Sequence, residues 1–164
     1  MTHKLYVEQL TEASKLPTRA TDHSACYDVY ADLDDRTVMM FKVGKRTQQS
    51  NGYLEIYPGD RVIVPTGLKM CCDPGWKIEL APRSGNAIKK GLTLINCTGI
   101  IDADYRDEVG ILLVNTGLEI VTVRDGERLA QLSLERVNYF DMVVGTLPET
   151  NSNRNGGMGH TGEM

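Results

Sequence analysis

The chain has 164 residues, enough for one domain whose core needs neither disulfides nor a metal for stability. Its formal net charge is −4, which gives no general nucleic-acid-binding signal, so a site for a polyanion must gather its positive charge locally. Sixteen glycines with only 6% aromatic residues are typical of a chain of many short strands and turns.

Cysteine usage and hydropathy indicate the compartment. The four cysteines have neither metal-site nor disulfide-framework spacing, and they predict buried thiols in a reducing environment. No signal peptide or long apolar run is evident, so we expect a cytoplasmic protein with no membrane partner.

Strands are expected near the N-terminus. Leu5, Val7 and Leu10 alternate loosely within residues 4–10, and residues 28–31 are typical of a short strand after a polar loop. Residues 36–57 are harder to assign. They include several basic side chains and a turn signal at residues 48–52, and they indicate either a hairpin arm or a surface loop.

The centre of the chain alternates turns and strands. Turns are predicted at residues 58–60 and 73–75, and strands at residues 61–68 and 76–81. The only predicted helix covers residues 84–91. Arg83, Ser84 and Gly85 lie at its start, and their cation, hydroxyl and small side chain can together bind phosphate oxygens.

Residues 92–115 predict the β-hairpin around which the chain is organised. Two apolar runs, residues 92–96 and 109–115, flank a polar segment that carries several acids and one aromatic ring. An ordinary solvated turn would explain these acids equally well, because Asp and Gly are common turn residues.

Four residues of this hairpin have the chemistry of a nucleoside pocket. The Asn96 carboxamide can pair with the edge of a planar, amide-bearing ring, and Gly99 permits close approach to the backbone. Asp102 can act as a general base, and Tyr105 offers a flat ring for a sugar or base.

The C-terminal third continues with strands and ends in a polar tail. Residues 119–123 predict a strand, and residues 124–126 predict a turn after it. Beyond Pro148 the chain is rich in Asn, Gly and Ser, which is typical of a disordered tail.

Five segments of the chain resemble, in order, the signature motifs of the trimeric dUTP pyrophosphatases (dUTPases). They are residues 25–29, 82–85, 99–106, 126–131 and 156–162. The fifth motif departs from the family pattern, because Met158 stands where phenylalanine is usual and Arg154 is displaced by one residue from the family's arginine. Cys26 and Asp107 replace glycines that are usual in the first and third motifs.

The resemblance implies an all-β fold, a jelly-roll-like β-barrel of the dUTPase type. This domain would span residues 1–150 with an insertion at about residues 36–57, and residues 151–164 would form a flexible arm that closes over the nucleotide. Because the family assembles as a homotrimer, the resemblance also implies active sites shared among three chains.

The implied reaction is hydrolysis of dUTP to dUMP and pyrophosphate with Mg²⁺, which limits uracil incorporation into DNA and supplies dUMP for thymidylate synthesis. Asp102 would activate the attacking water, and Asp28 would hold Mg²⁺ through water. Glu127 and Arg128 are expected to form structural ion pairs. The residues implied to bind the substrate are Arg83, Ser84, Gly85, Asn96, Gly99, Ile101, Tyr105, Gln131, Arg154, Met158 and Gly159.

Two other functions stay open. The dCTP deaminases share this fold and similar motifs, but their general acid–base glutamate would fall at Leu112, which cannot carry a proton. A nucleotide-binding regulator that keeps the pocket but turns over weakly would also fit the altered C-terminal arm.

Overall fold

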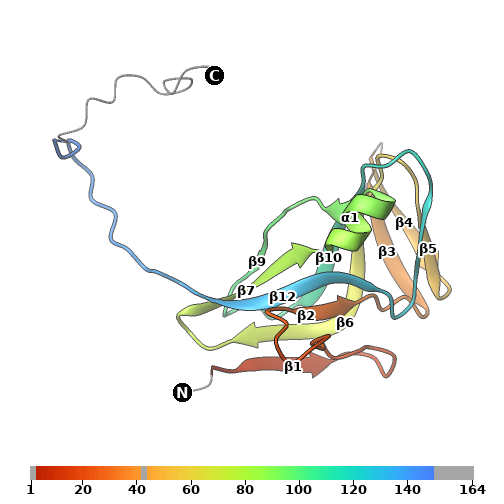
Figure 1. The fold of residues 1–164 in the computed structure, drawn as a ribbon, viewed down its shortest axis with the longest axis horizontal. Helices are drawn as coiled ribbons and strands as arrows, with labels where there is room; N and C mark the ends of the chain where they lie inside the picture. Colours follow the sequence, from red (N-terminus) through yellow and green to blue (C-terminus); the bar gives the residue numbers. More distant parts are fainter. Residues whose placement is uncertain (1–2, 42–43, 150–164) are drawn as a thin grey trace.

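The computed structural model describes residues 3–41 and 44–149, and it confirms the all-β prediction. Figure 1 shows the strands gathered into one body, from which the C-terminal segment extends. The single helix of the described residues is α1 (Ser84–Lys90). The strands are β1 (Leu5–Gln9), β2 (Tyr27–Tyr30), β3 (Arg36–Phe41), β4 (Lys45–Ser50), β5 (Tyr53–Ile56), β6 (Arg61–Cys72), β7 (Trp76–Pro82), β8 (Leu92–Leu94), β9 (Gly99–Ile101), β10 (Glu108–Asn115), β11 (Val121–Arg124) and β12 (Arg128–Arg136).

Strand β6 is the centre of the largest sheet. This six-stranded sheet has the order β4-β3-β6-β10-β8, and β1 also pairs with β6. The first residues of β6 pair with β3, and its last residues pair with β1. Strand β10 pairs antiparallel along β6 and alternates half-buried and buried side chains, as expected of a strand with one face on the core.

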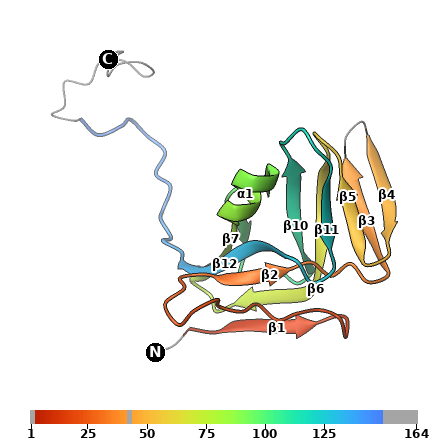
Figure 2. The same ribbon diagram turned by 45° about the vertical axis from the view of Figure 1, so that its right-hand side comes forward.

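The remaining strands form two smaller sheets. One has four strands in the order β2-β12-β7-β9, and the other joins β11 to β5. Figure 2 shows β2 and β12 lying across the lower end of β10 and β11. The sheets are not closed into a barrel, so the predicted jelly-roll-like barrel is corrected to packed open sheets; closure would require continuous pairing around the whole ring of strands.

The stretch at residues 36–57 forms ordered strands. Strands β3 and β4 make an antiparallel hairpin at the edge of the six-stranded sheet, and β5 follows it. The predicted turn at residues 48–52 is too wide, because residues 48–50 belong to β4 and only Asn51 and Gly52 bend the chain. Whether this stretch is an insertion stays a prediction.

The hairpin predicted at residues 92–115 is confirmed in its arms and corrected in its tip. Strands β8 and β10 pair antiparallel, with Leu94 opposite Leu113. The first arm ends at Leu94, and Ile95 and Asn96 lie in an exposed turn. The chain then crosses to the four-stranded sheet, where β9 pairs with β7. The tip is therefore anchored between two sheets instead of standing free.

Helix α1 confirms the predicted helix and ends one residue before the predicted end at residue 91. Gly91 follows the helix with φ 65° and ψ 14°, a left-handed conformation that glycine adopts without strain. Its N–H donates to the carbonyls of the last turn. A side chain here would also collide with the backbone of Gly117. No helix among the described residues is long and apolar enough to cross a membrane.

After β12 the chain leaves the body. The Val137 N–H donates to the Gly75 carbonyl at 2.9 Å, and the chain then runs without regular structure to Glu149 (Figure 1). Six large apolar side chains of this segment, which we call the apolar tail segment (residues 139–147), are 79–96% exposed. They are Tyr139, Phe140, Met142, Val143, Val144 and Leu147.

Candidate functional site

Asp28 is the hub of one group of candidate residues. It lies on β2, is only 2% exposed, and stands opposite Gln131 of β12. Its carboxylate accepts hydrogen bonds from Arg83 Nε at 3.0 Å, Arg128 Nη1 at 3.1 Å and Gln131 Nε2 at 3.3 Å. We call these four residues the Asp28 cluster. The structural ion pair expected of Arg128 is confirmed, and Glu127 pairs with Lys90 at 2.6 Å.

The start of α1 lies beside this cluster. Arg83 immediately precedes the helix and bonds Asp28, and its Nη1 also donates to the Arg128 carbonyl at 3.3 Å. Ser84 and Gly85 are exposed in the first turn, where backbone N–H groups have no helical partner. Two guanidinium groups and this turn gather the local positive charge that an acidic chain needs for a polyanion.

Replacing Asp28 with Asn is expected to lower the free energy of unfolding by about 3 kcal/mol. The amide keeps the shape but removes the buried charge that both guanidiniums share, and breaking such a pair costs about 3–5 kcal/mol. We expect a loss at the lower end of this range, because the side chains of Arg83 and Arg128 are 26% and 48% exposed and water can solvate their charges.

Chemical denaturation measures this loss. The matched control is Glu79→Gln, which removes a carboxylate from the same sheet but from a half-exposed pair with Lys77, worth less than about 1 kcal/mol. Equal losses in the two variants would contradict a structural role for the Asp28 charge.

A second group of candidates lies on the loop between β9 and β10, residues 102–107, which we call the acidic loop. Asp102 begins it and is exposed, and its carbonyl accepts the Tyr105 N–H at 3.1 Å, closing a β-turn. Arg106 Nη1 donates to the carbonyls of Ala103 and Tyr105, at 3.0 and 2.7 Å. The loop is thus braced by its own hydrogen bonds.

The Tyr105 hydroxyl is held as a donor. It donates to the Glu108 carbonyl at 3.1 Å. Burial raises the pKa of Tyr105, and the negative charges of Asp107 and Glu108 raise it further. The phenol therefore stays protonated at neutral pH. Burial also raises the pKa of the Cys72 thiol, with smaller contributions from Cys71, Asp73 and Asp102, so Asp102 lies within electrostatic reach of the end of β6.

The Asn96 side chain lies close to Gly99. A Cβ placed on Gly99 would come within 3.2 Å of Asn96 Nδ2 and 3.3 Å of Leu80 Cβ. Gly99 is buried, and Ile101, also buried, pairs with Ile78. In this structure the open face of Gly99 is thus covered by the Asn96 carboxamide and by β7.

The Asp28 cluster and the acidic loop lie at opposite ends of β7. Ile101, next to Asp102, stands opposite Ile78, whereas Arg83 follows the last residue of β7. The step of five residues along the chain from Ile78 to Arg83 corresponds to about 17 Å, at about 3.3 Å per residue. Reacting groups must approach to about 3–3.5 Å. One chain therefore does not bring Asp102 to the phosphate-binding candidates.

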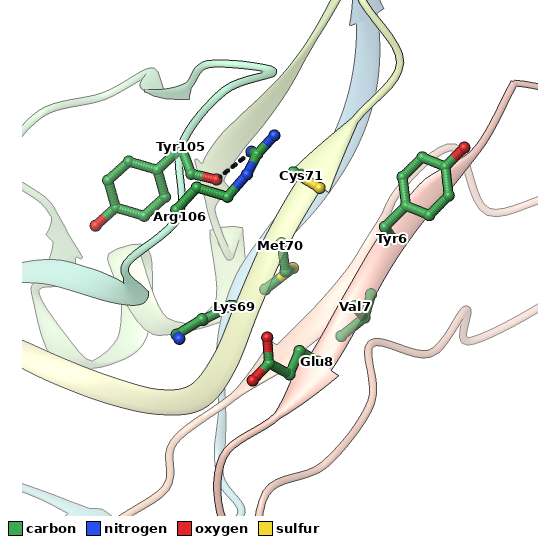
Figure 3. Close-up of a pocket in the computed structure, with 8 residues that line it drawn as sticks. All are labelled: Tyr6, Val7, Glu8, Lys69, Met70, Cys71, Tyr105 and Arg106. Atoms are coloured by element: carbon green, nitrogen blue, oxygen red, sulfur yellow. Dashed lines mark hydrogen bonds between the residues drawn. The ribbon is translucent and has the colours of Figure 1, made fainter.

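Of the proposed site residues, Tyr105 borders a cavity of about 380 Å³, shown in Figure 3, between β1, β6 and the acidic loop. Its ring points away from Cys71 and Tyr6 in this view. A second cavity, of about 420 Å³, is also bordered by Tyr105, together with Arg36, Glu108 and Leu112. Neither lining includes Asp28, Arg83 or Asp102.

The metal and cysteine predictions need refinement. Among residues 3–41 and 44–149, no three His, Cys, Asp or Glu side chains group closely enough to hold a metal ion directly. All four cysteines are free thiols, but the prediction that they are buried is wrong for Cys97, which is exposed. Only Cys72 is buried, and Cys26 and Cys71 are half-buried.

Some candidates cannot be placed, and others were missed. Arg154, Met158 and Gly159 lie outside the described residues. The sequence reasoning missed Arg36, whose guanidinium contacts Glu108 at the end of the acidic loop. No local signal could have paired them, because they are 72 residues apart in the chain.

Comparisons with known proteins agree with this fold. The family model described as dUTPase matches residues 49–162. A curated relative named deoxyuridine 5′-triphosphate nucleotidohydrolase, from Desulfotalea psychrophila, is 41% identical over 152 residues, which are 93% of this chain and 90% of that protein.

Two solved structures share the fold. One is a mutant of the Staphylococcus bacteriophage 80alpha dUTPase with dUpNHpp, at a TM-score of 0.77 and 21% identity, covering 98% of this chain and 99% of the other. The second is a mutant of the dUTPase from phage phi11 of S. aureus, whose structure concerns a structural Mg(II) ion. Its TM-score is 0.67 at 20% identity, covering 91% of this chain and 99% of the other.

Proposed function

This chain belongs to the dUTPase family, and from that premise we propose that it hydrolyses dUTP to dUMP and pyrophosphate by attack of water on the α-phosphorus. The observation that carries the proposal is the Asp28 cluster. Arg83 and Gln131 come from segments 55 and 103 residues away from Asp28, and both reach the same carboxylate. These are residues of three of the family's motifs.

The proposed roles divide between the two groups. Arg83, Ser84, Gly85 and Gln131 bind phosphate oxygens through charge and hydrogen bonds. Asn96 and the backbone of Gly99 and Ile101 bind uracil. The Tyr105 ring lies under the deoxyribose, and the Asp102 carboxylate accepts the proton of the attacking water. Residues 151–164 close over the nucleotide, with Arg154, Met158 and Gly159 in contact with it.

Mg²⁺ fits this site as an ion held mainly by the triphosphate and water. A carboxylate offers about four lone-pair positions, and Asp28 uses three of them on protein donors, which leaves one for a metal-bound water. When bound, the ion would neutralise charge on the phosphate oxygens. Asp28 would orient it through that water and keep both arginines in place.

We propose that the active protein is a homotrimer with shared sites. The separation of about 17 Å between the Asp28 cluster and Asp102 supports this, because a second chain must then supply one half of each site. The apolar tail segment supports the trimer too, because so many exposed apolar side chains close together in the chain are typical of an interface.

We also propose a cytoplasmic location, which the four free thiols support.

The alternatives have less support. Leu112 lines the cavity beside Tyr105 with an aliphatic side chain, which cannot carry the proton that a dCTP deaminase would move. A regulator without turnover would keep the binding groups but release no pyrophosphate, so the following assay separates it from the proposal.

Release of pyrophosphate from dUTP, dTTP, dCTP and UTP with Mg²⁺ tests the function. We expect kcat/KM for dUTP to exceed kcat/KM for each of the other three nucleotides by about tenfold to 200-fold. The 5-methyl group of dTTP in a fitted pocket is worth about that much, and an added hydroxyl, such as the 2′-hydroxyl of UTP, is worth about a hundredfold. The 4-amino group of dCTP leaves the uracil-binding groups unpaired, which costs at least as much. Comparable turnover of dTTP or UTP would contradict the assigned pocket, and no turnover of any nucleotide would favour the regulator.

A further inference from the structure

The Arg36 guanidinium connects the hairpin at residues 36–50 to the acidic loop. Arg36 is the first residue of β3, and 19% of its side chain is exposed. Its Nη2 donates to both carboxylate oxygens of Glu108, at 2.7 and 2.6 Å. A contact to both oxygens fixes the orientation of the carboxylate as well as its distance.

Glu108 stands directly after the acidic loop, at the first position of β10. Its Oε1 also accepts the Gly67 N–H at 2.7 Å, so β3 and β6 hold this side chain together. Its backbone carbonyl accepts the Tyr105 hydroxyl at 3.1 Å. The placement of the Tyr105 ring therefore depends on the placement of Glu108.

Asp32 holds Arg36 from the other side. Its Oδ2 lies 2.5 Å from Arg36 Nη1 and also accepts the Thr11 hydroxyl at 2.9 Å. Asp32 is 1% exposed, and its Oδ1 has no hydrogen-bond partner within the described ranges. A carboxylate buried in this way needs its counter-charge, so Arg36 cannot swing away from Glu108 without leaving Asp32 unpaired.

On its Asp32 side the arrangement has little space in which to relax, whereas Arg36 and Glu108 border the cavity of about 420 Å³ beside Tyr105. Gly67 has φ +66°, and a side chain there would collide with Asp32 Oδ2. Asp32 is therefore closely fitted against the backbone at Gly67, and Arg36 is fixed between this carboxylate and that of Glu108. A change at Arg36 removes the contact that orients the Glu108 side chain.

We infer that Arg36 is a positioning residue for discrimination between deoxyribose and ribose nucleotides, acting through Glu108 on Tyr105. The inference rests on the proposed function, in which the Tyr105 ring lies under the sugar and leaves no room for a 2′-hydroxyl. A ring released from its hydrogen bond to Glu108 no longer holds that boundary.

The test compares kcat and KM for dUTP and for UTP in the wild type, Arg36→Met and Arg46→Met. Methionine keeps an apolar side chain of similar reach without the charge. Arg46 is the matched control, because it lies at the other end of the β3–β4 hairpin and pairs at 3.0 Å with Asp60, which is also buried.

We expect Arg36→Met to lower the dUTP-to-UTP ratio of kcat/KM by about tenfold to a hundredfold, since a misplacement of about 1 Å can cost that much. Arg46→Met should keep the wild-type ratio. If Arg36→Met loses activity equally on both nucleotides and keeps the ratio, Arg36 is only structural and the inference is overturned.

A second variant covers the case in which Arg36→Met does not fold. Arg36→Lys keeps the charge, but its single ammonium nitrogen replaces the two guanidinium nitrogens that contact Asp32 and Glu108 separately. A dUTP-to-UTP ratio of kcat/KM below that of the wild type supports the inference, and an unchanged ratio overturns it. Failure of the wild type to hydrolyse dUTP would instead refute the proposed function.

Discussion

Asp102→Asn is expected to lower kcat for dUTP by about 10²–10⁴-fold, which is the usual contribution of a general base. The amide has the size and much of the hydrogen-bonding capacity of the carboxylate, but it cannot accept the proton of the attacking water. Because Asp102 is exposed at the start of the acidic loop and its backbone closes the turn to Tyr105, the substitution leaves the loop's own hydrogen bonds in place.

Steady-state kinetics together with calorimetric binding of a non-hydrolysable dUTP analogue separate catalysis from binding. The analogue should bind Asp102→Asn with nearly the wild-type Kd. Asp104→Asn is the matched control, because Asp104 is an exposed acid in the same turn, and it should keep the wild-type rate. If Asp102→Asn stays active while Asp104→Asn does not, Asp104 is the base and the assignment to Asp102 is wrong.

Mixing two inactive variants, Asp102→Asn and Arg83→Met, is expected to restore about one quarter of the wild-type turnover per site. Each variant alone has a defect in every site. If a site takes Asp102 from one chain and the Asp28 cluster from another, random assembly joins two intact halves in about a quarter of the sites. The physical reason is the separation of about 17 Å between the two halves within one chain.

The measurement is pyrophosphate release after the two proteins are unfolded together and refolded, or coexpressed with different tags. Arg83→Met mixed with Gln131→Ala is the matched control, because both changes fall in the Asp28 cluster and no mixed site can then contain an intact cluster. Restored turnover in that control, or none in the first mixture, would refute sites shared in this way. A monomer with full activity in sedimentation would refute the trimer as well.

Local features of the fold could be predicted from the sequence. Helix α1, the period-two strand β7, the turn at residues 73–75 and the apolar arms β8 and β10 all occur within two residues of the predicted bounds. These features depend on residues within a few positions of one another, such as a glycine that adopts positive φ or side chains that alternate across a strand. Local patterns contain most of that information.

The arrangement of the candidate site depends on contacts between distant parts of the chain. Nothing local to residues 99–101 indicates pairing with β7, because a strand's partner is chosen by packing across the sheet. The same is true of Arg36, whose partner Glu108 is 72 residues away. The hairpin residues alone suggested one pocket around Asp102, and only the register of β9 on β7 shows that the Asp28 cluster of the same chain lies about 17 Å away. Residue chemistry is local and could be predicted, but which groups meet is set by long-range strand pairing, which no short stretch of sequence contains.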